Sequence, residues 1–433
     1  MTSGENMKAE KKTDEEILKN VKEHILSFER VESHYCRRNS TKQYLDGSLN
    51  ISEMYRLYTD YCREKELPLA KKHIYSTVFH SLNLSFHQPK KDQCCICTGY
   101  KNSTDTEKLQ LQDNYNTHIK EKEMSRAEKT KDIEAAKQDT NKIACCFDLQ
   151  AVLPSPCGEC SSLYYKRKLS CYNFTIYDIS NSKGHCYFWH EGLAKRGSNE
   201  IGTCLYKFIT SLPNTVNEVV LFSDNCAGQN KNKFIASLLL YCVNNIDHIN
   251  TITHKFLIQG HTQNENDSMH STIEREKRRV VKGGTITLPA QWVPVLKLAK
   301  KKGSVYNVTE LDTADIFNLK DLSQQMGNNF SKNENNNLVN WPNIKIIKVM
   351  KQDPYTIFYK HSYAQEDFEK LNIRQRMRGR SAKVMLHPAY SSPPGIDAGK
   401  KKDLLDLCKS GVIPSVHASF YNSLKVSSSV EKD

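Results

Sequence analysis

The sequence lacks an apolar run long enough to cross a membrane. No stretch approaches the ~18 apolar residues that a membrane-spanning helix needs. The first residues, MTSGENMKAEKKTDEE, are charged from the start, so we expect neither a secretory signal nor a membrane partner. Internal repeats are not visible either. The 433 residues leave room for several domains and can bury a core without disulfide bonds.

Acidic residues are outnumbered, and this favours a polyanionic partner. Lys and Arg number 62 and Asp and Glu number 49, which gives a formal net charge of +13. An excess of this sign points first to nucleic acid. The 15 cysteines stand in a chain without an expected export signal, so we expect a reducing compartment. Most of them would be small buried side chains, and only closely spaced pairs suggest a metal site.

The N-terminal third predicts helices and charge rather than a large core. Residues 1–30 are charged and polar, and we expect a disordered tail there. Residues 31–103 predict a helical region in which Leu67-Pro68-Leu69 separates two amphipathic segments. This helix–turn–helix shape occurs in many DNA-reading modules and also in helical proteins generally. Residues 104–142 have too few apolar side chains for a core and predict a charged helical linker.

Residues 143–285 predict an α/β core. The strands are expected at 143–149, 171–178, 184–190, 218–223 and 251–259. Three helices are expected: one that begins at Ser198, one over 231–243 and one over 268–279. The order is β-β-β-α-β-α-β-α, which is that of the ribonuclease H-like fold, and the later alternation with helices implies parallel strands. Beyond this core we expect a basic and Asn-rich linker over 286–340 and a small C-terminal α+β region over 341–425.

Three aspartates fall at informative places in this order. Asp148 lies in the first strand, Asp224 ends the fourth strand, and Asp267 begins the last helix. Groups beyond the carboxyl ends of parallel strands share one crevice, so the three carboxylates can converge. Clustered carboxylates repel one another unless a cation neutralises them, and hard oxygen ligands suit Mg²⁺ or Mn²⁺. Such ions activate a water or hydroxyl for attack on a phosphodiester, which makes these aspartates candidate catalytic and metal-binding residues.

Each of these acids also has an ordinary structural interpretation. An aspartate within a strand can anchor hydrogen bonds, Asp224 can form a turn, and Asp267 can cap a helix. Glu274, about two helical turns after Asp267, is the alternative third acid, and Glu191 is a candidate fourth. The polar neighbours expected to face the same crevice are His261, Asn225, Gln229 and His270.

One close pair of cysteines suggests a zinc site. Cys94 and Cys97 form a Cys-x₂-Cys pair, which supplies half of a tetrahedral zinc shell. The candidate partners are His87, His118, His34 and Cys36. A second pair, Cys157 and Cys160, has the same spacing in a glycine-bearing turn and is the weaker candidate.

A basic segment follows the last acid. The bases proposed to contact nucleic acid are Arg275, Lys277, Arg278, Arg279 and Lys282, and a later run spans Arg374–Arg380. Beside a phosphodiester site, such a run would hold a DNA backbone and would also suit nuclear import. The ordinary alternative is a solvated surface.

Several motifs give the chain a family resemblance. The segment GHTQNENDSMHSTIERE is similar to the last helix of DDE transposases and retroviral integrases, where a polar loop leads to an acid. Residues from about 30 to about 430 resemble an uncharacterised domain family common in transposon-rich animal genomes. Its motifs stand here at His34–Arg37, Pro89–Cys94, Phe147–Pro154, Tyr172–Asp178, His190–Ile201, Ser223–Asn232, Gly260–Ser271 and Asp403–Pro414. The third acid is Asp where DDE enzymes have Glu, one methylene longer.

The resemblance implies a transposon-derived enzyme that cleaves DNA and transfers its strands. Asp148, Asp224 and Asp267 would hold Mg²⁺ or Mn²⁺, while water and then a 3′-hydroxyl attack phosphodiesters. A nuclear location and a homo-oligomer are expected, with DNA as the partner. Two alternatives stay open: a metal-dependent nuclease without strand transfer, and a catalytically inactive DNA-binding protein that the host has retained.

Overall fold

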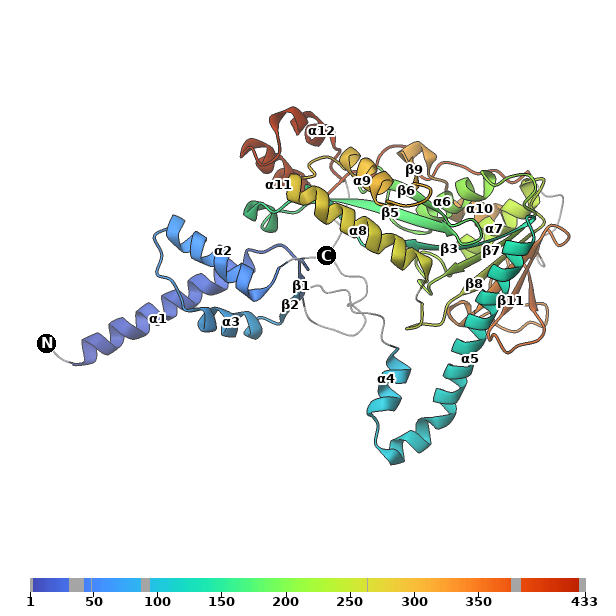
Figure 1. Ribbon diagram of the computed structural model, residues 1–433, viewed down its shortest axis with the longest axis horizontal. Helices are drawn as coiled ribbons and strands as arrows, with labels where there is room; N and C mark the ends of the chain where they lie inside the picture. The colour runs from blue at the N-terminus through green and yellow to red at the C-terminus, as the bar shows by residue number, and fades with distance from the viewer. Residues whose placement is uncertain are drawn as a thin grey trace. The chain divides into compact units, whose positions relative to one another are not determined.

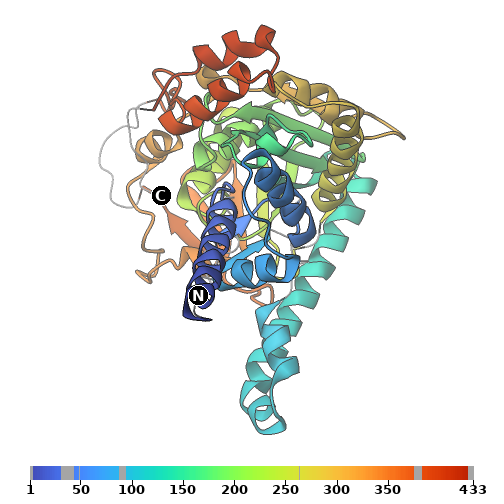
Figure 2. The same ribbon diagram turned by 90° about the vertical axis from the view of Figure 1, so that its left-hand side faces the viewer.

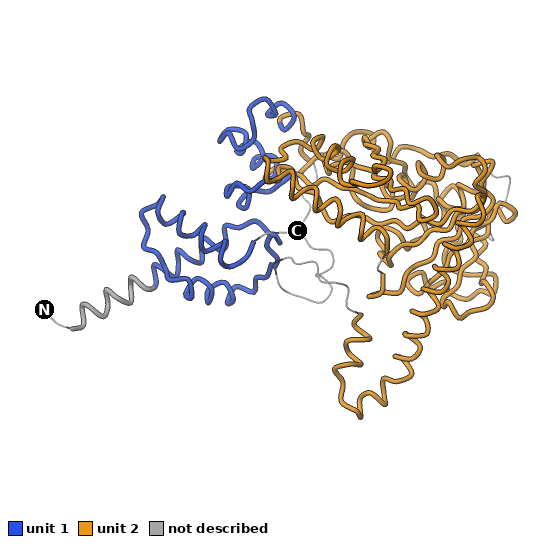
Figure 3. Tube along the Cα trace, in the orientation of Figure 1, with its two compact units in different colours: residues 1–91, 158–168, 399–421 blue, residues 92–157, 169–398, 422–433 orange. Residues whose placement is uncertain are grey.

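The computed structural model describes residues 3–30, 43–47, 49–86, 94–262, 264–374 and 383–427. The chain divides into two compact units (Figure 3). The first comprises residues 1–91, 158–168 and 399–421, and the second comprises residues 92–157, 169–398 and 422–433. None of the described helices is both long and apolar enough to span a membrane.

The first unit is a helical cluster. Its elements are α1 (Ser3–Leu26), β1 (Gln43–Leu45), α2 (Ile51–Glu64), α3 (Lys72–Ser81), β2 (Leu84–Phe86), α11 (Ala398–Lys409) and most of α12 (Ala418–Ser423). Strands β1 and β2 pair in parallel. Asn50 caps α2 by accepting from the backbone N–H of Glu53 at 3.0 Å. Asp403 of α11 accepts from Arg167 Nε at 2.7 Å, which ties two distant segments together within this unit.

The structure differs from the disordered tail expected over residues 1–30. Val21, Ile25 and Phe28 are buried in one apolar cluster with residues of α2 and α3. The spacing of four residues places Val21 and Ile25 on one face of α1, and Phe28 follows just after the helix ends at Leu26. A few apolar residues at the helical period are therefore enough to hold its C-terminal part against the unit.

The second unit is an α/β domain built on a ten-stranded sheet (Figures 1 and 2). Its central elements are β3 (Lys142–Leu149), β5 (Leu169–Asp178), β6 (Lys183–His190), α6 (Ser198–Thr210), β7 (Glu218–Ser223), α7 (Lys233–Asn245), β8 (Thr251–Phe256) and α8 (Glu265–Gly283). The α/β class is confirmed, and these elements follow one another in the predicted order. The short strand β4 (Leu153–Ser155) is an addition that pairs with β5.

The middle of the sheet has the strand order β6-β5-β3-β7-β8. Strand β5 is antiparallel to both of its neighbours, whereas β3, β7 and β8 run parallel. The short hairpin between β5 and β6 makes that pair antiparallel, and the helices that connect β7 to β8 and precede β7 allow β3, β7 and β8 to run parallel. Strands β3 and β7 are continuous apolar runs because helices cover both faces of a parallel sheet.

Strands from the last third of the chain extend the sheet at both ends. β9 (Asn307–Glu310) pairs with β6, while β10 (Ile346–Met350) pairs with β8 and is followed by β11 (Thr356–Lys360) and β12 (Glu369–Asn372). The structure therefore differs from the linker expected over 286–340 and from the separate region expected over 341–425. Ile347 and Val349 are buried in the same core as β7, so β10 completes the central domain.

Helices cover both faces of the sheet. On one face, α6, α7 and α10 (Leu319–Met326) bury residues such as Phe147 of β3. On the other face lie α8 and α9 (Trp292–Leu298), together with the C-terminal part of α5 (Asp105–Gln138), which packs on Cys146 (Figure 1). The first half of α5 extends beyond the sheet beside α4 (Cys95–Asn102) (Figures 1 and 2). Where a charged linker was expected, α5 pairs Asp132 with Lys255 of β8 at 2.5 Å.

The contact between α6 and α10 gives a stability prediction. A Cβ atom on Gly202 would lie 2.3 Å from Leu319 Cδ1 and 3.1 Å from Leu238 Cδ2, both in the buried core. We expect Gly202→Ala to lower the free energy of unfolding by about 1–3 kcal/mol through overpacking, measured by urea denaturation.

The matched control is Gly99→Ala in α4, where nothing lies within 4 Å of the added Cβ. We expect this variant to be neutral or to gain up to ~1 kcal/mol, because alanine is the better helix former. Equal stability of the two variants would contradict the packing of α10 on α6.

Candidate functional site

Two of the three predicted acids lie side by side at one edge of the sheet. Strands β3 and β7 are parallel neighbours in which Cys146 pairs with Phe222, so Asp148 and Asp224 each stand two residues further on. Cys146 and Phe222 both face α5, and the alternation of side chains along β3 places Asp148 toward that same face, while Asp224 begins the loop after β7. The charges of both aspartates act on Cys226: burial is the main cause that raises the pKa of its thiol, and the two carboxylates raise it further. Both carboxylates therefore lie near Cys226, and their convergence on one cation stays a prediction.

Asp148 faces the last helix of the core. Its Oδ1 accepts from the backbone N–H of Leu149 at 2.8 Å, and its Oδ2 lies 4.0 Å from His270 Nδ1 on α8. The Asp148 side chain keeps 25% of its surface exposed, so a solvated ion has access to it. His270 was predicted to face this crevice, and it does.

Asp224 opens a polar loop that leads to α7. Its Oδ1 accepts from the backbone N–H of Cys226 at 3.1 Å and from Asn230 Nδ2. Asn225 accepts from Lys231 Nζ at 3.0 Å and donates to the carbonyl of Leu257. These bonds hold the loop against the end of β8, so the SDNCAGQNKN motif fixes the position of the carboxylate.

Asp267 does not join the other two aspartates. It is exposed and closes a capping box, in which its Oδ2 accepts from the backbone N–H of Asn264 at 2.9 Å. Among the described residues, the three aspartates do not bring their ligand atoms within 4.8 Å of one another. The structure thus differs from the expected triad, because α8 turns residues 266, 270 and 274 toward the sheet and residue 267 toward solvent.

The inward face of α8 carries Asn266, His270 and Glu274. Asn266 is fully buried and donates to Thr175 Oγ1 at 2.8 Å. Glu274, the alternative third acid, lies 3.4 Å from Gln150 Nε2 and 3.2 Å from Lys277 Nζ. His270 lies between them on the helix, and its Nδ1 is the atom of this face that lies 4.0 Å from Asp148 Oδ2.

The hydrogen bonds of Thr175 determine how the His270 ring is oriented. Thr175 Oγ1 donates its single proton to the carbonyl of Asp148 at 3.1 Å and lies 2.7 Å from His270 Nε2. With the Thr175 proton assigned to that carbonyl, Nε2 donates in the second contact, and this tautomer directs the Nδ1 lone pair toward Asp148. Burial lowers the pKa of His270 to about 4, so the ring is neutral near pH 7 and its lone pair is available to a cation.

Two other predicted neighbours have structural partners. Gln229 donates to the carbonyl of Arg196 at 3.3 Å, which links the loop after β7 to the turn before α6. Glu191 accepts from the backbone N–H of Ser170 at 2.7 Å, at the start of β5. Neither contact directs the side chain to Asp148.

The predicted nucleic-acid residues lie along α8. Arg275, Arg278, Arg279 and Lys282 are exposed, and Lys277 is partly buried. Arg279 Nη2 lies 2.5 Å from Glu276, whose pKa falls to about 2 because Arg279 and Lys301 donate to it. Lys277 pairs with Glu274. Arg275, Arg278 and Lys282 are thus the exposed bases of α8 whose charge is not placed next to a glutamate carboxylate in the ion pairs of this helix. Of the later basic run, residues 375–380 lie outside the described residues.

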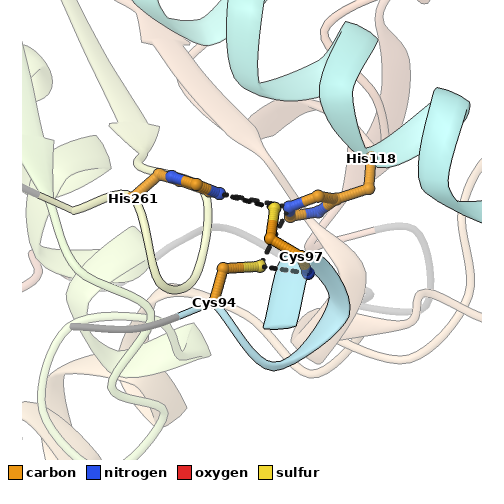
Figure 4. Close-up of side chains that lie close together, drawn as sticks. All are labelled: Cys94, Cys97, His118 and His261. Atoms are coloured by element: carbon orange, nitrogen blue, oxygen red, sulfur yellow. Dashed lines mark hydrogen bonds between the residues drawn. The ribbon is translucent and has the colours of Figure 1, made fainter. Parts of the chain in front are cut away.

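A second group of side chains converges at the base of the α4–α5 hairpin. Cys94, Cys97, His118 and His261 bring one ligand atom each within 4.8 Å of all the others (Figure 4). Cys94 Sγ lies 3.0 Å from His118 Nε2, Cys97 Sγ lies 3.5 Å from His261 Nε2, and the two Nε2 atoms are 3.3 Å apart. His118 was among the predicted partners of the cysteine pair, whereas His261 was predicted to face the carboxylates instead.

Three separate segments bring these four residues together. Cys94 is the N-cap of α4, Cys97 lies in its first turn, His118 is in α5, and His261 follows β8. Gly260 has φ +76°, and a Cβ there would lie 2.5 Å from Cys94 Cα. A glycine is therefore required for the His261 loop to reach Cys94.

The electrostatics of this cluster favour neutral imidazoles. Burial, followed by the charge of Lys122, lowers the pKa of His118, and burial, followed by His118, lowers the pKa of His261. Burial also raises the pKa of Cys97, against the charge of Lys122. The histidines are thus unprotonated near neutral pH, which is the form that binds a metal.

The remaining zinc candidates do not join this cluster. Residues 34, 36 and 87 lie outside the described residues. Cys157 pairs through its backbone with Ile286, and Cys160 Sγ lies 3.1 Å from Ser162 Oγ.

Lys231 gives a pH prediction for the loop after Asp224. Burial, together with the nearby charge of Lys345, lowers the pKa of Lys231 to about 7. Because an unfolded lysine titrates near ~10.4, the unfolded chain holds a proton that the folded chain has lost between these values, and the free energy of unfolding rises with pH there. We expect Lys231→Met to remove this rise, measured by urea denaturation between about pH 7 and pH 10. Lys233→Met, at an exposed position, should keep it; identical slopes for both variants would contradict the burial of the Lys231 ammonium.

Comparison with known proteins identifies one domain. A family model described as Domain of unknown function (DUF7869) matches residues 176–363. The matched stretch includes Asp224, His261 and His270, whereas Asp148, Cys94, Cys97 and His118 precede it. No curated protein and no solved structure matches this chain. Residues 176–363 are therefore similar to a domain for which no activity is described.

Proposed function

We propose that this chain is a transposon-derived, DDE-like enzyme that uses divalent metal ions to cleave DNA and transfer its strands. The observation that carries the proposal is the placement of Asp148 near the end of β3 and of Asp224 directly after its parallel neighbour β7, with His270 beside Asp148. The transposon origin rests on the sequence motifs. DNA as substrate and a nuclear location rest on the net charge of +13 and on the exposed bases of α8.

The strand order supports a ribonuclease H-like core. The order β6-β5-β3-β7-β8, with β5 as the antiparallel member, follows a β-β-β-α-β-α-β-α sequence of elements. In such a sheet, polar groups beyond the carboxyl ends of β3 and β7 share one crevice. Helix α8 lies over the same face and adds its own ligand to that crevice.

The donor atoms fit a divalent cation. The 4.0 Å between Asp148 Oδ2 and His270 Nδ1 allows one ion bonded to both at about 2.0–2.2 Å when the two ligands lie on nearly opposite sides of it. When bound, Mg²⁺ or Mn²⁺ would lower the pKa of a water or hydroxyl and stabilise the leaving oxygen of the phosphodiester. Thr175, which accepts a hydrogen bond from Asn266, would hold the imidazole so that its Nδ1 lone pair stays directed at the ion site.

The protein would hold the DNA by its backbone. Arg275, Arg278 and Lys282 lie on the exposed side of the helix whose inner side carries His270. A duplex held along this side would bring a phosphate to the carboxylates without base contacts. Helices α2 and α3 of the first unit are a second DNA-contact candidate, in line with their helix–turn–helix arrangement.

A catalytically inactive DNA-binding protein is the second candidate function. The specific observation in its favour is that Asp267, which matches the third acid by sequence, is exposed and occupied as a helix cap. A descendant of a transposase that had lost its third carboxylate would keep the fold and the basic surface. A nuclease without strand transfer shares the metal site and differs only in the reaction product.

The metal site can be tested by binding and by cleavage together. We expect the purified full chain to bind Mn²⁺, followed by electron paramagnetic resonance, and to nick supercoiled plasmid DNA in its presence. Asp148→Asn and Asp224→Asn should weaken Mn²⁺ binding and lower nicking by roughly 10²–10³-fold, since each removes a ligand charge at the reacting centre. DNA binding in the absence of Mn²⁺ should be unchanged.

Two variants on α8 distinguish the ligand from the cap. His270→Ala should lower both Mn²⁺ binding and nicking, whereas Asp267→Asn should leave both unchanged and reduce stability by about 1 kcal/mol or less. Mn²⁺ binding without nicking would favour the inactive descendant. Failure of the unmutated protein to bind Mn²⁺ would contradict the proposed metal site.

A further inference from the structure

We propose that Cys94, Cys97, His118 and His261 bind one Zn²⁺ ion in a closed, tetrahedral Cys₂His₂ site. The site is separate from the carboxylates and independent of the catalytic proposal. Its function is structural, because four protein ligands leave no open position for water or substrate.

The spacing of the four donor atoms agrees with a common centre. For Zn–N bonds of about 2.0–2.1 Å and Zn–S bonds of about 2.3 Å at tetrahedral angles, two nitrogens lie about 3.3 Å apart and a sulfur and a nitrogen about 3.5 Å apart. The distance between His118 Nε2 and His261 Nε2 is 3.3 Å, and that between Cys97 Sγ and His261 Nε2 is 3.5 Å. The Cys94 Sγ to His118 Nε2 distance is somewhat shorter, at 3.0 Å. All four side chains point toward one another (Figure 4).

The chemistry of the donor set selects zinc. Two thiols and two imidazoles in a tetrahedral arrangement suit Zn²⁺ rather than Mg²⁺ or Ca²⁺, which prefer sites made mainly of oxygen ligands. The backbone N–H of Cys97 lies 3.5 Å from Cys94 Sγ, so it can donate to a thiolate, and Lys122 adds positive charge near the same thiols. Both features offset the negative charge that the deprotonated cysteines carry.

The local fold also indicates a need for a metal. Helix α4 has no buried residue of its own along Cys95–Asn102, and its main aromatic contact is the stacking of Tyr100 on Tyr115 at 3.9 Å. So short a helix gains little from apolar burial, and nucleating it is unfavourable without tertiary contacts. A metal that joins Cys94 and Cys97 to α5 and to the His261 loop would supply the missing attachment.

Such a site would also fix the start of α8. His261 lies three residues before Asn264, the N-cap of α8, and the helix carries His270 two turns later. The loop bearing His261 is held on one side by Gly260 against Cys94 and on the other by the helix cap. The zinc would thus connect the α4–α5 hairpin to the helix that faces Asp148.

The experiment uses the full chain purified under reducing conditions. We expect one zinc per chain by mass spectrometry. Replacement by Co²⁺ should give the absorption bands of tetrahedral cobalt together with a thiolate-to-cobalt charge-transfer band. Cys97→Ala and His261→Ala should lose the stoichiometric metal, whereas Cys160→Ala, in the second cysteine pair, should retain it.

A melting curve keeps the test independent of how the variants fold. Removing the metal from the unmutated protein with a chelator should lower the melting temperature, and the same treatment should leave that of folded His261→Ala unchanged. A folded, reduced wild-type protein with no zinc and no thiolate–cobalt band would overturn the site. So would a His261→Ala variant that keeps the full metal content and an unchanged cobalt spectrum. Neither outcome bears on Mn²⁺ binding at Asp148, so failure of this site and failure of the catalytic proposal are distinguishable.

Discussion

The parallel pairing of β3 with β7 is the constraint on which the rest of the site depends. It aligns Cys146 with Phe222, so Asp148 stands near the end of β3 and Asp224 directly after the end of β7. Adjacent strands lie about 4.8 Å apart, so the backbones that carry these two carboxylates are neighbours. Two anionic groups held this close are costly in an apolar domain unless a cation or hydrogen bonds offset their repulsion. The N–H groups at Leu149 and Cys226 supply part of that compensation.

Helix α8 links the two candidate metal sites. Its inner face contacts the sheet through Asn266, His270 and Ile273, while the loop just before it carries His261 into the Cys/His cluster. A shift of this helix would therefore change both the distance from His270 to Asp148 and the geometry of the cluster.

Much of the central fold could be predicted from the sequence, because β3 and β7 are uninterrupted apolar runs and the helices between strands have the helical period. The last third could not, since its Asn-rich composition is typical of a linker. Its asparagines instead bond to the backbone, as Asn329 does to the carbonyl of Lys332 at 2.7 Å. These hydrogen bonds depend on how the chain folds in three dimensions, which cannot be inferred from amino-acid composition.

The candidate site was predictable only in part for a similar reason. Strand order brings Asp148 to Asp224, but the rotation of α8 decides whether Asp267 or His270 faces them, and a capping aspartate looks the same in sequence as a ligand. His261 joins Cys97 across 164 residues, beyond the reach of any spacing rule for a local zinc motif.

The most direct test of the account is anomalous diffraction at the manganese edge from crystals of the full chain soaked in Mn²⁺. The account predicts a peak bonded to Asp148 and Asp224, with His270 Nδ1 as a further ligand. A well-diffracting crystal without a manganese peak between these aspartates, or with its carboxylates turned away from each other, would contradict it.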